Sequence, residues 1–138
     1  SGMRAGPAGV EFFHGYTCAG PPRAAAAGVA TLDLYQRGDI FARARALEPY
    51  WEDAVHSLDR SANVIDVRNI GIVAAIEVAG RANAPGARAF DVFLECFRRG
   101  VLVRQTGDAI ALSPPLIAEG RPVDEIIGTL AAALKTVA

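Results

Sequence analysis

A single arginine interrupts an apolar stretch near the C-terminal end of the sequence, where Val101–Pro115 reads VLVRQTGDAIALSPP. Alternating residues before and after Thr106-Gly107-Asp108 predict a β-hairpin, and the two prolines end its second strand. The planar guanidinium of Arg104 suits a carboxylate held by two hydrogen bonds. Arg104 is therefore a candidate carboxylate-binding residue. Two alternatives stay open, since Arg104 could also pair with a local Asp or Glu or extend into water.

A second candidate site lies in the loop Gly15–Gly20, which precedes a predicted helix. Free backbone N–H groups at the start of a helix, together with a nearby hydroxyl, bind phosphate well. Thr17 supplies such a hydroxyl, so the loop is a candidate anion site. The alternative is that the Thr17 hydroxyl makes a hydrogen bond within a local turn.

The other residues with reactive side chains do not form a recognisable catalytic or metal-binding pattern. His14 and His56 have no paired acid or nucleophile in the sequence, so we expect both to be structural or exposed. Cys18 and Cys96 are far apart and neither belongs to a CxxC motif, which favours a reduced, cytoplasmic protein without a disulfide framework or a metal site. Lys135 is the single lysine and should be solvated.

The composition is typical of one globular domain. The chain has 138 residues, of which 51% are hydrophobic and 21% are charged, and its net charge is -1. A near-neutral charge argues against binding nucleic acid or an anionic membrane surface, and no run approaches the length of a membrane span. No signal peptide is visible, and Ser1-Gly2 before Met3 resembles the remnant of a cleaved tag.

Hydrophobic periodicity and turn residues predict four helices and four strands. The expected helices are 22–37, 39–58, 87–99 and 122 to the C-terminus, and the expected strands are 64–68, 72–78, 101–105 and 109–113. Within the second helix, Asp39 is expected to cap the N-terminus and Pro49 to kink the helix or split it. In the third helix, the spacing of Phe90, Phe93 and Phe97 predicts the buried face.

These elements predict an α+β domain with a small, mostly antiparallel sheet and helices on one face, because the strands come mainly as hairpins. We divide the chain into residues 1–9, a tag remnant and loose N-terminus, residues 10–38, a loop and helix, and residues 39–138, the domain proper. The Ala-rich first helix is predicted to belong to a partner surface.

Three motifs resemble class III (omega-type) pyridoxal-phosphate-dependent aminotransferases, in that family's order. They are HGYTCAGPPRAAAAGVATLDLY, RNIGIVAAIEV and LVRQTGDAIALSPPL. The resemblance extends from Val10 to Val137 and is greatest to the beta-alanine/omega-amino acid–pyruvate transaminases. It implies that the chain corresponds to the C-terminal small domain of a fold-type I enzyme, together with the interface loop and helix that lead into it.

The resemblance also implies roles for two residues. Thr17 matches the threonine that binds the cofactor phosphate, donated in that family to the neighbouring subunit's active site. Arg104 matches the mobile arginine that holds the carboxylate of the amino acid or keto acid substrate and swings aside for an apolar side chain. A homodimer, or pairing with a large-domain chain, is the implied assembly.

Other parts of the family's active site have no match in this sequence. The lysine that links covalently to pyridoxal 5'-phosphate lies upstream in the family, and Lys135 does not match it. Pro21 replaces a histidine of the phosphate loop and removes one N–H. The sequence therefore predicts no catalytic residue of its own, no cofactor bound by this chain alone, and no turnover alone. The alternative hypothesis is a stand-alone oligomerisation or binding module that complements a separately encoded large domain; a decayed, inactive gene product is a third.

Overall fold

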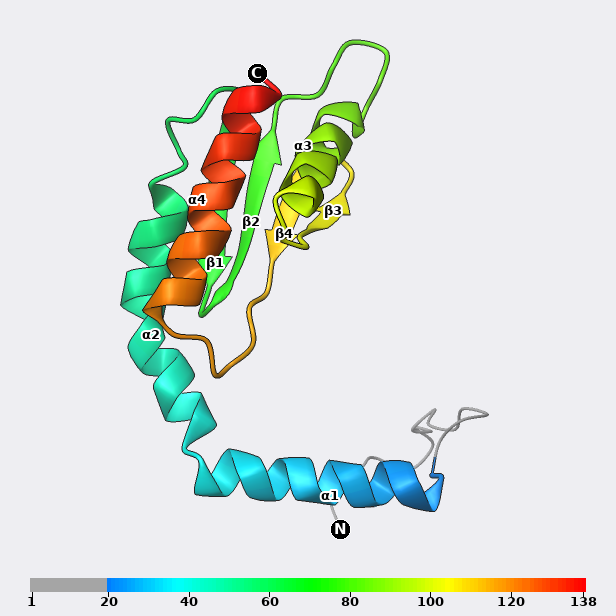
Figure 1. Cartoon of the computed structure of the whole chain (residues 1–138), viewed down its shortest axis with the longest axis vertical. Helices are drawn as coiled ribbons and strands as arrows, with labels where there is room; N and C mark the ends of the chain where they lie inside the picture. The colour runs from blue at the N-terminus through cyan, green and yellow to red at the C-terminus, as the bar shows by residue number, and fades with distance from the viewer. Residues whose placement is uncertain (1–19) are drawn as a thin grey trace, which may run out of the picture. The chain divides into compact units, whose positions relative to one another are not determined.

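The computed structural model describes residues 20–138, which form four helices and four strands (Figure 1). The helices are α1 (Pro22–Arg37), α2 (Ile40–His56), α3 (Ala87–Arg98) and α4 (Gly120–Thr136). The strands are β1 (Val64–Ile70), β2 (Val73–Val78), β3 (Arg104–Thr106) and β4 (Ala109–Leu112). The chain divides into two compact units between Arg37 and Gly38, so that α1 belongs to the first and all other elements to the second. Among the described residues, no helix is both long and apolar enough to cross a membrane.

The four strands form one antiparallel sheet in the order β1-β2-β4-β3. The two predicted hairpins account for the β1–β2 and β3–β4 pairs, and pairing of β2 with β4 joins them. The first hairpin turns through Gly71 and Ile72, where Gly71 has a φ of 54°, a conformation that glycine adopts without strain. The second hairpin turns at Gly107 and Asp108, close to the predicted position. β3 begins at Arg104 rather than Val101, and it is an edge strand because it pairs only with β4.

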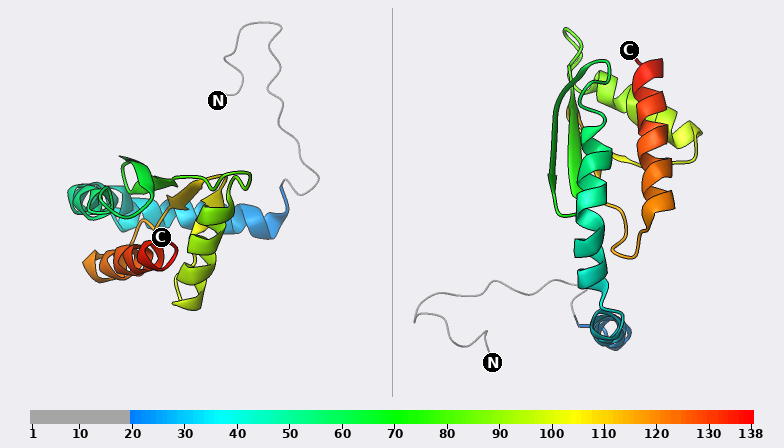
Figure 2. Two further views of the ribbon diagram at one scale, coloured as in Figure 1. Left: turned by 90° about the horizontal axis from the view of Figure 1, so that it is seen from above. Right: turned by 90° about the vertical axis from the view of Figure 1, so that its left-hand side faces the viewer.

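The hydrophobic core lies between one face of the sheet and the helices α3 and α4, while α2 packs against α4 and β1 (Figure 2). Alternate residues of β2 and β4 point into this core, as their burial patterns show. The buried residues of α4 recur every three or four positions along the helix, and they include Val123, Ile127 and Leu130. The predicted α+β class, with helices on one face of an antiparallel sheet, is confirmed.

The predicted buried face of α3 is wrong by one residue position. Phe90 and Phe97 are 49% and 61% exposed, whereas the buried residues are Ala89, Val92 and Cys96. Two apolar stripes run side by side on this helix, and the stripe of small residues faces the core because it lets α3 approach the sheet closely. Phe90 and Phe97 lie on the outside, whereas Phe93 is partly buried and packs against the core. The three rings stack, with centroid distances of 5.9 Å between Phe90 and Phe93 and 6.5 Å between Phe93 and Phe97.

Helices α2 and α4 also differ from the sequence-based expectations. α2 continues through Pro49 as one 17-residue helix, so of the two expected effects of this proline, a kink or a split, the split does not occur. Asp39 lies at the N-cap position of α2, but its backbone is left-handed and its side chain makes no capping hydrogen bond. α4 begins at Gly120, earlier than expected, which places Asp124 beyond the first turn. There the Asp124 carboxylate accepts a hydrogen bond from the Tyr50 hydroxyl and ties α4 to α2.

Candidate carboxylate-binding site

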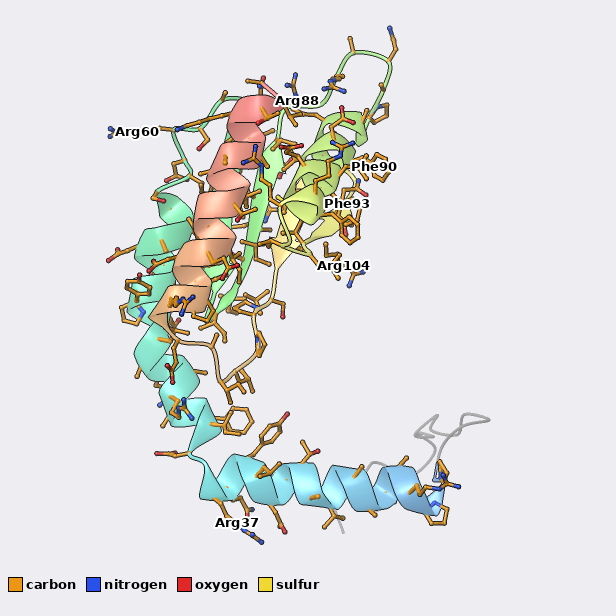
Figure 3. The ribbon with its side chains drawn as sticks, viewed as in Figure 1. Arg37, Arg60, Arg88, Phe90, Phe93 and Arg104 are labelled. Atoms are coloured by element: carbon orange, nitrogen blue, oxygen red, sulfur yellow. The ribbon has the colours of Figure 1, made fainter. Side chains whose placement is uncertain are left out.

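Arg104 lies on the face of the sheet opposite α3 and α4. The register pairs Arg104 with Ala111, Ala111 with Ala75 and Ala75 with Arg68, so these four residues share one face. The neighbouring Gln105 pairs with the fully buried Ile110 and therefore belongs to the core face. Figure 3 shows the Arg104 side chain pointing away from the ribbon beside β3.

The Arg104 guanidinium is exposed, and no side chain among residues 20–138 forms a hydrogen bond or an ion pair with it. The alternative of a local ion pair therefore has no support in the part of the chain that the structure describes. Glu77 on β2 pairs with a different arginine, because its carboxylate accepts a hydrogen bond from Arg68 at 2.9 Å. Arg104 is thus positioned to bind an anion that comes from outside these residues.

The turn that carries Arg104 is anchored to the start of α3. The carboxylate of Asp108 accepts a hydrogen bond from the backbone N–H of Gly86 at 2.7 Å, and its carbonyl accepts one from the N–H of Val78 at 2.9 Å. Gly86 has a φ of 76°, and a Cβ there would lie 3.3 Å from the carbonyl oxygen of Gly107. These contacts hold the short edge strand β3 in place, although β4 is its only partner within the sheet.

An apolar hollow of about 500 Å³ adjoins Arg104 where the two chain segments of the hairpin diverge. Its walls include Val101 and Leu102 on one side and Pro114 and Pro115 on the other. Leu102 is 75% exposed and lies two residues before Arg104, so both point to the same side of the extended chain. Leu102 lines this hollow but was not singled out from the sequence, although its spacing of two from Arg104 is a signal that the sequence contains.

Among residues 20–138, the other residues singled out from the sequence do not gather around Arg104. Thr17, His14 and Cys18 lie outside the described residues. Lys135 is exposed on the last turn of α4, a helix that covers the opposite, core-facing side of the sheet. Cys96 is buried in the core, and this burial raises the pKa of its thiol to about 11, so it is an unreactive thiol at neutral pH. Among residues 20–138, no group of three or more His, Cys, Asp or Glu side chains could hold a metal ion.

His56 connects the end of α2 to the first hairpin. Its Nε2 lies 3.1 Å from Oδ1 of Asn69, and its Nδ1 lies 3.4 Å from Oδ2 of Asp59. The hydrogen bond to Asn69 raises the pKa of His56 above its usual value, and Asp59 adds to this effect. This is a structural position, as expected from the sequence.

The raised pKa of His56 predicts that the protein is more stable below about pH 6 than at pH 8, when other titrations are subtracted. A raised pKa stabilises the fold while the imidazole is protonated, and this contribution is lost as the pH rises through the folded-state pKa. The effect should stay below about 1 kcal/mol, because the side chain is 38% exposed. Urea unfolding of the protein and of His56→Gln at both pH values measures it. His14 is still present in this variant, so any pH dependence that His14 causes remains in both proteins. If His56→Gln has the same pH dependence as the unsubstituted protein, the effect does not come from His56.

Comparison with known proteins places this arrangement in a family. Residues 3–134 match the family described as aminotransferase class-III. The chain is 53% identical over 128 residues to an omega-aminotransferase of Caulobacter vibrioides, covering 93% of this chain. It is 36% identical over 129 residues to a beta-alanine–pyruvate aminotransferase of Pseudomonas aeruginosa, covering 94% of this chain. In both relatives the match spans 29% of the relative's length.

The fold agrees with the sequence match. A crystal structure of a thermostable omega transaminase mutant from Pseudomonas jessenii superimposes with a TM-score of 0.82 at 25% identity, over 92% of this chain and 30% of the other. A transaminase structure determined with L-alanine gives a TM-score of 0.80 at 30% identity, over 91% of this chain and 31% of the other. The described fold is thus that of part of a pyridoxal-phosphate-dependent transaminase of fold type I.

The chain belongs to the class-III aminotransferases. It aligns with the C-terminal part of omega-aminotransferases and spans about 29% of the length of the curated relatives it matches. Class-III aminotransferases depend on pyridoxal phosphate. The described residues alone do not fit this group, because the chain's single lysine lies across the sheet from Arg104 and cannot link to an aldehyde held beside it.

Proposed function

We propose that this chain is the part of an omega-amino acid–pyruvate transaminase that binds the substrate carboxylate. Such an enzyme transfers an amino group from an omega-amino acid to pyruvate. The observation that carries the proposal is Arg104, an exposed guanidinium with no protein partner among residues 20–138, at the position where the family's motif has its substrate arginine. Its partner would be the carboxylate of the amino acid or keto acid, held through two parallel hydrogen bonds.

The remainder of the active site would lie outside the 138 residues of this sequence. We propose that pyridoxal 5'-phosphate, which supplies the electron sink for amino transfer when it is bound, attaches to a lysine outside these 138 residues. Thr17 would then bind its phosphate across a subunit boundary, as the family motif implies. Domain boundaries follow the same assignment, with residues 10–38 as interface loop and helix and residues 39–138 as the small domain.

We expect the 138-residue chain alone to produce no alanine from an omega-amino acid, pyruvate and added pyridoxal phosphate, because it lacks a suitably placed lysine. We expect activity from a chimera in which the 128 aligned residues of this chain replace the corresponding segment of the 53% identical Caulobacter omega-aminotransferase. Coupled detection of alanine measures both. The chimera with Lys135→Met serves as the control and should retain its activity. Turnover by the chain alone would contradict the proposal.

The second candidate function is an assembly module, and the exposed surface of α1 favours it. α1 has no buried residue, and Val29, Leu32 and Leu34 are each 62% exposed. An amphipathic helix with uncovered aliphatic side chains is suited to packing against a partner, either a second copy or a large-domain chain. The activity assay of the chimera distinguishes the two candidate functions, because only the first predicts that the chimera is active. Sizing with light scattering shows whether the chain associates, and adding the remainder of the Caulobacter enzyme as a separate chain shows whether association restores turnover.

A cytoplasmic location completes the proposal. It rests on the two cysteines, which do not form a disulfide framework in the sequence, and on Cys96, which is a free, buried thiol.

A further inference from the structure

The carboxylate of Asp108 supplies, from another part of the chain, a contact that the sequence of α3 does not provide locally. α3 has no acidic residue in its first turn, and its N-cap residue, Gly86, has no side chain that could accept a hydrogen bond. The Asp108 carboxylate accepts the hydrogen bond of the Gly86 N–H and places a negative charge near the positive end of the helix dipole. Asp108 therefore joins the turn of the second hairpin to the start of α3.

The two segments fit closely around this hydrogen bond. A Cβ at Gly80 would lie 3.3 Å from Oδ2 of Asp108, so the glycine makes room for the carboxylate. Asp108 is half-buried, and among residues 20–138 its carboxylate takes part in no ion pair. Its position is thus explained by the backbone of Gly86 and not by a charged side chain.

The start of α3 is itself fixed from another direction. Arg88, in the first turn of this helix, donates from Nε to the carbonyl oxygen of Ala79 at 2.8 Å and from Nη1 to that of Val137 at 3.2 Å. Figure 3 shows Arg88 at the end of the domain where α3 begins. Asp108 therefore ties the hairpin to a point that is held by β2, α3 and the end of the chain.

The hairpin that carries Arg104 requires such an anchor. β3 has three residues, begins at Arg104 and pairs only with β4, and Asp108 lies in the turn between these strands. A two-stranded ribbon is only marginally stable without further packing. A shift of the turn would change the direction of β3, and with it the point from which the Arg104 side chain extends.

We propose that Asp108 is a positioning residue for Arg104. By accepting the hydrogen bond of the Gly86 N–H, it fixes the edge strand so that the guanidinium meets the substrate carboxylate in the geometry of two parallel hydrogen bonds. This inference rests on the proposed function, in which Arg104 binds that carboxylate. It predicts that Asp108 and Arg104 act as one unit, although the two side chains are not bonded to each other.

A double-substitution cycle in the chimera tests the proposal, with single-turnover kinetics for an omega-amino acid and for an amine that has no carboxylate. Asp108→Ala should lower kcat/KM for the omega-amino acid by about tenfold, chiefly through KM, because the arginine is displaced. Asp108→Asn keeps an oxygen that accepts the Gly86 hydrogen bond and should restore most of the loss. In the Arg104→Gln background, Asp108→Ala should cause a further loss of less than about twofold.

Asp124→Ala is the matched control. Asp124 is also a carboxylate that joins two elements, but these elements are α2 and α4 and not the hairpin. Its replacement should lower stability without changing the ratio of kcat/KM between the two donors. Gly80→Ala presses on the Asp108 carboxylate and should lower that ratio, whereas Gly128→Ala, whose Cβ meets nothing within 4 Å, should not.

Hydrogen exchange of the 138-residue chain tests the anchor without turnover. Asp108→Ala should raise the amide exchange rates of Gly86 and β3 by about tenfold or more, while those of β1 and β2 change little. Unchanged exchange overturns the anchor. Equal losses for both donors, or the full loss again in the Arg104→Gln background, overturn the positioning of Arg104. An Arg104→Gln chimera that does not discriminate between the donors overturns the proposed function, and this inference with it.

Discussion

Replacing Trp51 with alanine is expected to lower the free energy of unfolding by about 3–5 kcal/mol, which is a large fraction of the stability of a typical domain. Trp51 is fully buried on α2 and is among the largest of the fully buried side chains in the described chain. Its removal leaves a cavity in the core between the sheet and the helices, and a small core has little capacity to close it. Urea unfolding followed by circular dichroism measures the change.

Two further variants show whether the loss comes from packing. Phe97→Ala removes an aromatic ring that is 61% exposed, and it should cost far less than Trp51→Ala. Trp51→Phe keeps most of the buried volume and removes the indole Nε1–H, which has no hydrogen-bond partner among residues 20–138. Trp51→Phe should therefore lower the free energy of unfolding much less than Trp51→Ala does. A Trp51→Ala protein as stable as Phe97→Ala would contradict the placement of Trp51 in the core.

The elements of this fold were predictable because their signals are local. Alternation and turn glycines identify both hairpins, and Gly100, with a φ of 89°, follows α3 as a helix-terminating glycine does. The choice between two apolar stripes on α3 was not local. Phe90 and Phe97 have the larger apolar surface, but the packing distance between helix and sheet favours Ala89, Val92 and Cys96. Similarly, tertiary packing against α4 and β1 outweighs the local preference of Pro49 to interrupt α2.

The candidate site shows the same division between local and non-local information. The residue type of Arg104 and its apolar setting are local features, and they are enough to suggest carboxylate binding. Whether Arg104 has a protein partner depends on strand order. In the order β1-β2-β4-β3, strand β4 separates Arg104 from Asp66 and Glu77, the carboxylates that pair with Arg68. The hollow depends on where the hairpin segments diverge, which no periodicity reveals.

In the active chimera, Arg104→Gln is expected to lower kcat/KM for an omega-amino acid donor by about 30-fold or more, equivalent to at least about 2 kcal/mol. The loss arises because the substrate carboxylate would be left without its charged partner once the site is covered. The kcat/KM of Arg104→Lys should lie between those of the unsubstituted chimera and Arg104→Gln. An ammonium keeps the charge but cannot form the paired hydrogen bonds of a guanidinium. The donor half-reaction is measured alone by single turnover, because pyruvate also has a carboxylate.

An amine donor without a carboxylate provides the internal control for this prediction. Its kcat/KM should change by less than about threefold in Arg104→Gln, because the variant keeps the lysine, the cofactor site and the fold of the chimera intact. Arg60→Gln, which replaces another exposed arginine of the same domain, should leave both donors unaffected. An equal loss for both donors in Arg104→Gln would show that the arginine supports the fold or the cofactor site rather than the substrate carboxylate. A selective loss would assign this charge to substrate recognition, since a single exposed guanidinium with no protein partner among residues 20–138 would then account for the discrimination between donors.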